Sequence, residues 1–121
     1  MSDMITFLKP DFEFDDDRGW LRQLCHEGWT QVNLSYTKKN IFRGGHLHRE
    51  NREAFYIVQG KIDITLEKDG KTENLIVTEN SFFAIEKGVK HTFKHLEETL
   101  MLAMYDKGVE NENGQRDIWT E

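Results

Sequence analysis

Hydrophobic and polar residues alternate with a period of two along much of this chain. The clearest case is 61–67, where isoleucine or leucine occupies positions 62, 64 and 66 and polar residues stand between them. Such alternation predicts a strand with one buried face. The Asp69–Gly70 pair then predicts a tight hairpin turn into a second strand at 72–77.

Further short strand-like segments recur about every ten residues, and no segment keeps a helical period over three turns. The predicted strands lie at Ile5–Leu8, 12–14, 20–24, 30–38, 53–59, 81–85, 91–95 and 99–105. Regularly spaced short strands are typical of a β-sandwich or barrel, so we predict an all-β fold. The chain has no internal repeat or linker, and we expect 1–121 to form one domain.

The tail of the chain is polar and predicts little regular structure. We expect residues 107–117 to be loosely held, with Ile118 and Trp119 as candidate anchors.

Composition narrows the function classes. The chain has 121 residues, a formal net charge of -6 and one cysteine, Cys25. The charge argues against nucleic acid or anionic lipid as a partner, and one cysteine excludes an internal disulfide framework. No apolar run reaches the roughly 18 residues of a membrane span, and the N-terminus lacks the pattern of a secretory leader. We therefore expect a cytoplasmic protein that acts on a small molecule.

Residues that commonly ligate metals concentrate in one stretch. His46 and His48 are two apart and would face the same way in an extended strand, Glu53 starts the next predicted strand, and His91 follows about 40 residues later. Three imidazoles and a carboxylate suit a divalent transition metal such as Fe, Mn, Ni, Zn or Cu, and the ligand set alone does not choose between them. The alternative is a polar interior whose histidines act as general bases or bond one another.

The spacing of these residues resembles the first motif of the cupin family, H-x-H-x4-E-x6-G, completed here by Gly60. Residues 80–95 resemble the second motif, with two residues between Gly88 and His91. The resemblance implies a double-stranded β-helix, or jelly-roll barrel, with His46, His48, Glu53 and His91 as metal ligands.

Several positions depart from the cupin pattern. Asn40 and Asn80 stand where glycine is usual, Glu86 replaces a proline, and His95 replaces an asparagine. Asparagine tolerates the left-handed backbone conformation that glycine supplies, so the fold is little affected by the first two changes.

A narrower resemblance covers most of the chain. Residues 14–21, FDDDRGWL, resemble the start of the dTDP-sugar epimerase-like cupins, and 43–49, RGGHLHR, are similar to the nucleotide-sugar 3,4-ketoisomerases and the capsular polysaccharide cupins. This implies an isomerase or epimerase that moves a proton on a nucleotide-linked keto sugar through an enediolate, in surface-polysaccharide biosynthesis. The ketoisomerases work without metal and need not keep Glu53, whereas a complete ligand set favours a metal-carrying member.

Candidate roles follow from that chemistry. His46 or His48 would be the base, because histidine titrates near neutrality. A metal-bound histidine cannot also be the base, so with a metal present the shuttle would be His95, Tyr36 or a metal-bound hydroxide. Substrate contacts are expected from Arg43, whose guanidinium suits a phosphate, and from Arg18 and Trp29. For both arginines a structural ion pair is the alternative.

Two other function classes remain open from the sequence, a metal-dependent cupin oxygenase acting on a small organic acid and a non-catalytic ligand-binding cupin. Sheets with unpaired edges associate readily, so we also expect a symmetric homodimer, with the strand Ile5–Leu8 as a candidate for exchange.

Overall fold

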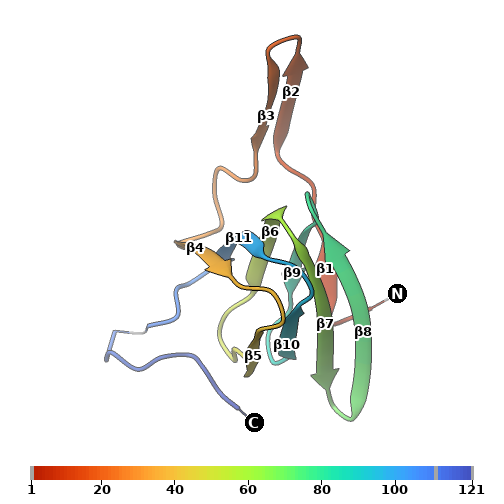
Figure 1. The fold of residues 1–121 in the computed structure, drawn as a ribbon. Helices are drawn as coiled ribbons and strands as arrows, with labels where there is room; N and C mark the ends of the chain where they lie inside the picture. The colour runs from red at the N-terminus through yellow and green to blue at the C-terminus, as the bar shows by residue number, and fades with distance from the viewer. Residues whose placement is uncertain (1, 111, 121) are drawn as a thin grey trace.

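The computed structural model describes residues 2–110 and 112–120, and within them every regular element is a β-strand (Figure 1). The strands are β1 (Ile5–Phe7), β2 (Phe12–Asp16), β3 (Gly19–Gln23), β4 (Gln31–Thr37), β5 (Phe42–His46), β6 (Glu53–Gln59), β7 (Lys61–Lys68), β8 (Lys71–Thr78), β9 (Phe82–Ile85), β10 (Lys90–His95) and β11 (Thr99–Tyr105). The predicted all-β class is confirmed. A helix able to span a bilayer is absent from the described residues.

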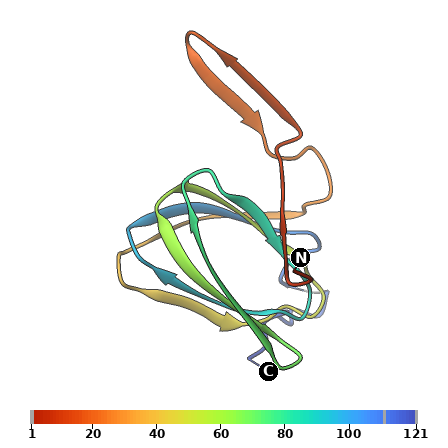
Figure 2. The same ribbon diagram turned by 90° about the vertical axis from the view of Figure 1, so that its right-hand side faces the viewer.

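Two antiparallel sheets face each other and enclose the core (Figure 2). One has the strand order β1-β9-β6-β11-β4 and the other β5-β10-β7-β8. Non-consecutive strands are neighbours in both, as in a jelly roll. Because β6 and β11 belong to the first sheet and β5 and β10 to the second, inward side chains from both sheets meet in one interior.

The period-two pattern is seen directly in burial. Along β7, the side chains of Ile62, Ile64 and Leu66 are fully buried, while the alternate residues are partly exposed. The β7–β8 register places Lys68 opposite Lys71, so Asp69 and Gly70 form a two-residue turn, both with positive φ (52° and 78°). This is the geometry that the Asp-Gly pair predicts.

Glycine and asparagine hold the backbone positions that the cupin pattern requires. Gly60 has φ +126°, and a Cβ there would lie 2.6 Å from Thr99 Oγ1 and 2.7 Å from the Glu98 carbonyl oxygen, so only glycine fits. Asn40 and Asn80 both adopt the left-handed conformation, with φ 67° and 71°. The expectation that asparagine replaces glycine at these turns is confirmed.

Glu86, which replaces the usual proline, makes a different connection. Its carboxylate accepts hydrogen bonds from Arg52 Nε (2.8 Å) and Nη2 (3.0 Å) and from Thr6 Oγ1 (2.7 Å). Burial acts to raise the pKa of Glu86, but these bonds outweigh it and the pKa is lowered. A charged pair therefore ties β1 and the turn before β10 to the residue that precedes Glu53.

The two chain ends both pack on the barrel. The strand predicted at Ile5–Leu8 forms as β1 (Ile5–Phe7) and pairs with β9, and its exchange between subunits stays a prediction. The tail expected to be loose is fastened at Asp117, which is buried, and the main chain of Trp119, one of the two predicted anchors, forms a two-way bridge with Leu47.

The hairpin of β2 and β3 projects from the barrel as an arm (Figure 2). We call residues 12–23 the arm. Its strands pair only with each other, and Phe12, Phe14, Trp20 and Leu21 are each about half exposed or more.

Candidate active site

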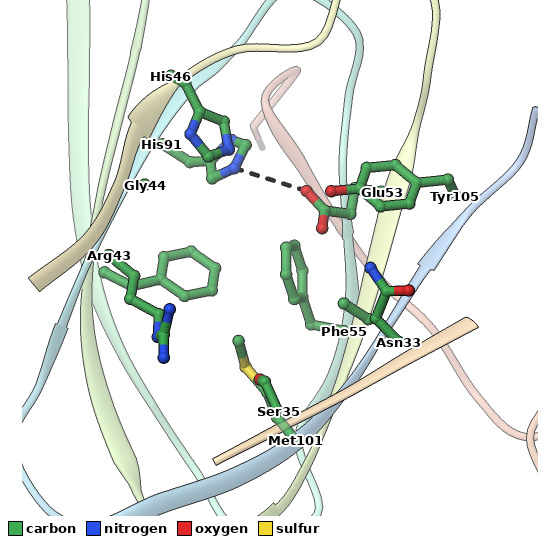
Figure 3. A pocket seen from close by; sticks show the side chains of 12 residues that line it. Asn33, Ser35, Arg43, Gly44, His46, Glu53, Phe55, His91, Met101 and Tyr105 are labelled. Carbon is green, nitrogen blue, oxygen red and sulfur yellow. Dashed lines mark ion pairs between the residues drawn. The ribbon is translucent and has the colours of Figure 1, made fainter. Parts of the chain in front are cut away.

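A cavity of about 160 Å³ lies between the two sheets (Figure 3). It is lined by inward side chains of β4, β5, β6, β10 and β11: Asn33, Ser35, Arg43, Gly44, His46, Glu53, Phe55, His91, Phe93, Met101, Ala103 and Tyr105. Glu53 and His91 at one end are buried, whereas Arg43 at the other is exposed. The cavity thus has a closed acid–base end and an open cationic end.

Strand pairing brings the histidines together. In the β5–β10 register His46 lies opposite His91, with a bulge next to His91. The strands approach closely at Gly44, where φ is +91° and a Cβ would lie 2.6 Å from the His91 carbonyl oxygen. Glycine at position 44 is therefore what permits the two histidines to meet.

The four residues predicted as ligands converge. The ring centres of His46 lie 5.0 Å from His48 and 4.8 Å from His91. Glu53 Oε1 lies 2.9 Å from His48 Nε2 and 3.5 Å from His91 Nε2. The structure thus brings His46, His48, Glu53 and His91 into one cluster.

The hydrogen bonds of His48 define its protonation. Nδ1 donates to the main-chain oxygen of Asp117 (2.6 Å), and Nε2 faces the Glu53 carboxylate. Both partners are acceptors, so both ring nitrogens carry hydrogen in this arrangement. Burial acts to lower the pKa of His48, but the bond and charge of Glu53 and the Asp117 carbonyl outweigh it, and the pKa is raised.

His46 and His91 are neutral for the opposite reason. Burial, and then the charges of the neighbouring histidines, lower the pKa of His91 to about 3. Burial and the charge of His48 also lower the pKa of His46, which is only half buried and lines the cavity. The site therefore holds one charged histidine beside two neutral ones.

Tyr105 is a site residue that sequence reasoning missed. It lines the cavity from β11, beside Glu53 (Figure 3). Burial, followed by the charge and hydrogen bond of Glu53, raises the pKa of its phenol, which stays protonated. Period-two alternation along β11 carries the signal, because Met101, Ala103 and Tyr105 all face the cavity.

Asn51 and Asp117 are two further residues beside the site that sequence reasoning did not single out. The Asp117 carboxylate accepts hydrogen bonds from the main-chain nitrogens of residues 49, 50 and 51, from Asn51 Nδ2 and from Trp119 Nε1, all between 2.8 and 3.0 Å. Asn51 is 1% exposed, and its Oδ1 accepts from the main-chain nitrogens of 107 and 108. No local pattern signals this contact, because the partners are more than 50 residues apart.

Three predicted site residues lie elsewhere in this chain. Tyr36 is on the outer face of β4, where its hydroxyl donates to Glu98 Oε2 (2.6 Å), because strand alternation turns it away from the inward Ser35. Trp29 packs against a second group of buried residues, which includes Tyr56, Phe82 and Met104. Arg18 is at the arm's turn and donates to Asp16. None of the three lines the cavity.

His95 faces the barrel interior two positions beyond Phe93, but it is not among the cavity-lining residues. It is fully buried, and neither ring nitrogen has a partner within the described residues. Burial and the charge of Arg43 lower its pKa. His95 is thus separate from the cluster that holds His91.

Arg43 lines the cavity as predicted. Its Nε donates to Thr37 Oγ1 (2.6 Å), which orients the guanidinium across the cavity from the histidines (Figure 3). The predicted alternative, an ion pair with the acidic turn at 15–17, is not formed.

The donor set fits a divalent transition metal. Ring nitrogens of His46, His48 and His91 lie within 4.8 Å of one another. Ligand atoms about 2.1 Å from one ion are about 3.0 to 3.4 Å apart, and Glu53 Oε1 lies 2.9 Å from His48 Nε2 and 3.5 Å from His91 Nε2. Binding would require His48 to lose the proton on Nε2.

Comparison with known proteins identifies the family. The family described as polysaccharide biosynthesis C-terminal domain matches residues 14–113. The chain belongs to this family. A search of curated protein sequences gives no match.

Solved structures show the same fold. A 3,4-ketoisomerase from Helicobacter canadensis has a TM-score of 0.78 and 20% identity, covering 97% of this chain and 90% of that one. A 3,4-ketoisomerase from Thermoanaerobacterium thermosaccharolyticum in complex with TDP-4-keto-6-deoxyglucose has a TM-score of 0.80 and 17% identity, covering 100% and 90%. A dTDP-4-dehydrorhamnose 3,5-epimerase from Bacillus anthracis has a TM-score of 0.71 and 20% identity, covering 91% and 75%. The predicted cupin jelly roll is confirmed.

The hydrogen bonds to Asp117 predict a pH dependence of stability. Burial acts to raise the pKa of this carboxyl, but bonds from Asn51, the loop and Trp119 outweigh it and lower the pKa to about 2, from an ordinary 3.8. A depressed acid pKa stabilises the folded state above the ordinary value, and that contribution is lost as the pH falls toward 2. We expect the unfolding free energy of the native protein to fall by roughly 2 kcal/mol more than that of Asp117→Asn between pH 5 and pH 2.

Urea denaturation at a series of pH values measures this difference. Glu110→Gln, which removes an exposed carboxylate paired with Arg116 on the same segment, is the control and should follow the native profile. Parallel curves for the native protein and Asp117→Asn would contradict the prediction.

Proposed function

We propose that this protein is an isomerase of nucleotide-linked keto sugars, of the 3,4-ketoisomerase type, in polysaccharide biosynthesis. The observation that carries the proposal is the composition of the cavity. His46, Glu53 and Tyr105 line its closed end, His48 pairs with Glu53 behind that lining, and Arg43 lies at its open end. Proton transfer next to a carbonyl needs a base and groups that stabilise the negative charge developing on the oxygen, and these residues can supply both.

The size of the cavity supports a sugar ring as the reacting group. An apolar cavity of about 150 Å³ holds benzene, and this cavity, about 160 Å³ and open at one end, has room for one ring at a time. A nucleotide therefore stays outside while the sugar enters. Arg43, exposed at the open end, is placed to pair with the diphosphate that links the two.

The reaction follows from these positions. His46, neutral and facing the cavity, removes the proton from the sugar carbon next to the carbonyl. Tyr105 donates a hydrogen bond to the carbonyl oxygen as charge develops, and the nearby His48 cation stabilises the enediolate. His46 then returns the proton to the former carbonyl carbon, and the proton of the neighbouring hydroxyl passes to the former carbonyl oxygen, so that the two carbons exchange carbonyl and hydroxyl.

The solved structures favour this type within the isomerase and epimerase group. The matches to 3,4-ketoisomerases cover 90% or more of those chains, against 75% for the epimerase from Bacillus anthracis. One of these ketoisomerases was crystallised with TDP-4-keto-6-deoxyglucose, which makes that compound the first substrate to test.

We predict that the purified protein exchanges the C3 hydrogen of TDP-4-keto-6-deoxyglucose with solvent deuterium and forms the 3-keto sugar. His46→Asn should slow the exchange at least about 100-fold, because it removes the base. Proton NMR in deuterium oxide measures both events.

His26→Asn is the matched control, since His26 is exposed and pairs with Asp11 away from the cavity. It should exchange at the native rate. Deuterium at C5 as well would indicate a 3,5-epimerase. If neither TDP- nor UDP-linked 4-keto-6-deoxy sugars exchange or isomerise, the proposed function is wrong.

We further propose that the same cluster binds a divalent transition metal through His46, His48, Glu53 and His91. Such an ion would supply a Lewis acid for the carbonyl oxygen. His46 would then be a ligand and no longer a base, so the metal-bound and metal-free states differ in how they can act. The support is that ring nitrogens of His46, His48 and His91 lie within 4.8 Å of one another, with Glu53 Oε1 2.9 Å from His48 Nε2, and the ion can be Fe, Mn, Ni or Zn.

We predict about one equivalent of metal per chain in protein purified without chelators, and none in the variant that combines His46→Ala with His91→Ala. Elemental analysis measures it, with His26→Ala as the control. Less than about a tenth of an equivalent in the native protein would refute metal binding. Sugar exchange that survives chelation assigns the chemistry to His46, and exchange lost on chelation assigns it to the metal.

We also propose a symmetric homodimer. Large apolar side chains stay exposed on the arm and on the outer face of β4, where Val32, Leu34 and Tyr36 are 52–67% exposed. Apolar groups gathered in this way mark interaction surfaces. The outer edge of β4 also lacks a partner strand within its own sheet.

We predict a dimer at micromolar concentration in sedimentation equilibrium. Leu34→Glu should weaken association at least about tenfold, because it places a charge in an apolar interface. Thr72→Glu, on the exposed face of β8, is the control and should leave association unchanged. A native protein that sediments as a monomer would contradict the proposal.

A further inference from the structure

The last described residues of the chain lie against the loop between His48 and Glu53. Leu47 and Trp119 exchange main-chain hydrogen bonds in both directions, at 2.7 and 3.0 Å. Arg49 also stacks on the Trp119 ring, 4.0 Å from its centre. The C-terminal segment, residues 115–120, thus packs on both sides of His48 in the sequence, at Leu47 and Arg49.

One side chain in this segment accepts the main-chain hydrogen bonds of a whole loop. Three consecutive main-chain N–H groups, at residues 49 to 51, point to the Asp117 carboxylate, and Asn51 Nδ2 and Trp119 Nε1 add two more donors. Consecutive N–H groups of an irregular turn form an anion-binding concavity, here filled by the protein's own carboxylate. This loop sets the separation of His48 and Glu53, which begin and end it.

The main chain of the same residue holds His48. The Asp117 carbonyl oxygen lies 2.6 Å from His48 Nδ1. A carbonyl only accepts, so Nδ1 carries the hydrogen and Nε2 is the nitrogen directed to Glu53 and the interior. The orientation of the imidazole is therefore decided from outside the cavity.

We propose that Asp117 is a positioning residue for His48. Its carboxylate fastens the 49–51 loop, and this contact holds its own carbonyl against His48, which keeps Nδ1–H directed at that carbonyl and Nε2 turned toward Glu53. The consequence for catalysis rests on the proposed function, but the position of the imidazole hydrogen does not. A histidine base, acid or ligand needs this kind of orienting partner.

Asp117→Asn tests the proposal with almost no change in shape. Either orientation of the amide sets an NH₂ group against main-chain N–H donors, which loosens the loop. In protein labelled with ¹⁵N at histidine, NMR should show a persistent Nδ1–H signal for His48 in the native protein. In Asp117→Asn this signal should be lost, because the Nδ1 hydrogen exchanges rapidly with solvent once its carbonyl partner moves away. With an exchanging sugar substrate, kcat should fall about 10- to 100-fold with little change in KM.

Glu110→Gln is again the control and should keep the native histidine spectrum. If Asp117→Asn does not fold, Trp119→Phe, which removes one of the five donors, is judged by the same signal. A native-like Nδ1–H signal in the folded variant, accompanied only by a lower melting temperature, would overturn the proposal. Because the spectrum needs no substrate, absence of sugar isomerisation would refute the proposed function and leave this test intact.

Discussion

The pairing of His48 with Glu53 inside the barrel is the interaction on which the rest of the site depends. Burying charged groups is unfavourable unless each is paired and hydrogen-bonded. His48 and Glu53 are 3% and 5% exposed. Asp117 accepts the remaining hydrogen bond of His48, and Tyr105 forms a further hydrogen bond with Glu53. The pair therefore requires a tail that returns to the barrel and a tyrosine on β11.

Burial and the charges at this pair together set the protonation of its neighbours. Burial, and then the charges of neighbouring histidines, lower the pKa values of His46 and His91, and burial followed by the charge of Glu53 raises the pKa of Tyr105. The result is a set of groups with different proton affinities around one small cavity, which is the arrangement that acid–base chemistry needs. The same donors suit a metal ion, and proton and metal compete for the Nε2 atom of His48.

Close backbone contacts fix the positions of the strands that carry the site residues. Gly44 lets β5 approach β10 at His91, and Gly60 lets β6 turn into β7 beside Thr99. At Glu86 the chain replaces a rigid proline by an ion pair with Arg52. These contacts lie close to the site in sequence, so the stability of the barrel and the geometry of the cluster are coupled.

Much of the fold and half of the site could be read from the sequence. Period-two alternation reports which face of a strand is buried, so the strands, the Asp69–Gly70 turn and the convergence of His46, His48, Glu53 and His91 were all predictable, the last through the cupin spacing. The same alternation carries Tyr105, although it was overlooked. These features depend on local period or on a recurring spacing.

What only the tertiary structure decided is how distant segments meet. Tyr36 and Trp29 lie outside the cavity because the sheet order sets which face of β4 is inward, and Arg18 extends away on an arm. Asp117 became the partner of a loop 66 to 68 residues earlier because the tail crosses the barrel end there. A polar tail has no period that reports its partner, since a hydrogen bond between remote residues depends on the path of the chain and leaves no mark on the local sequence.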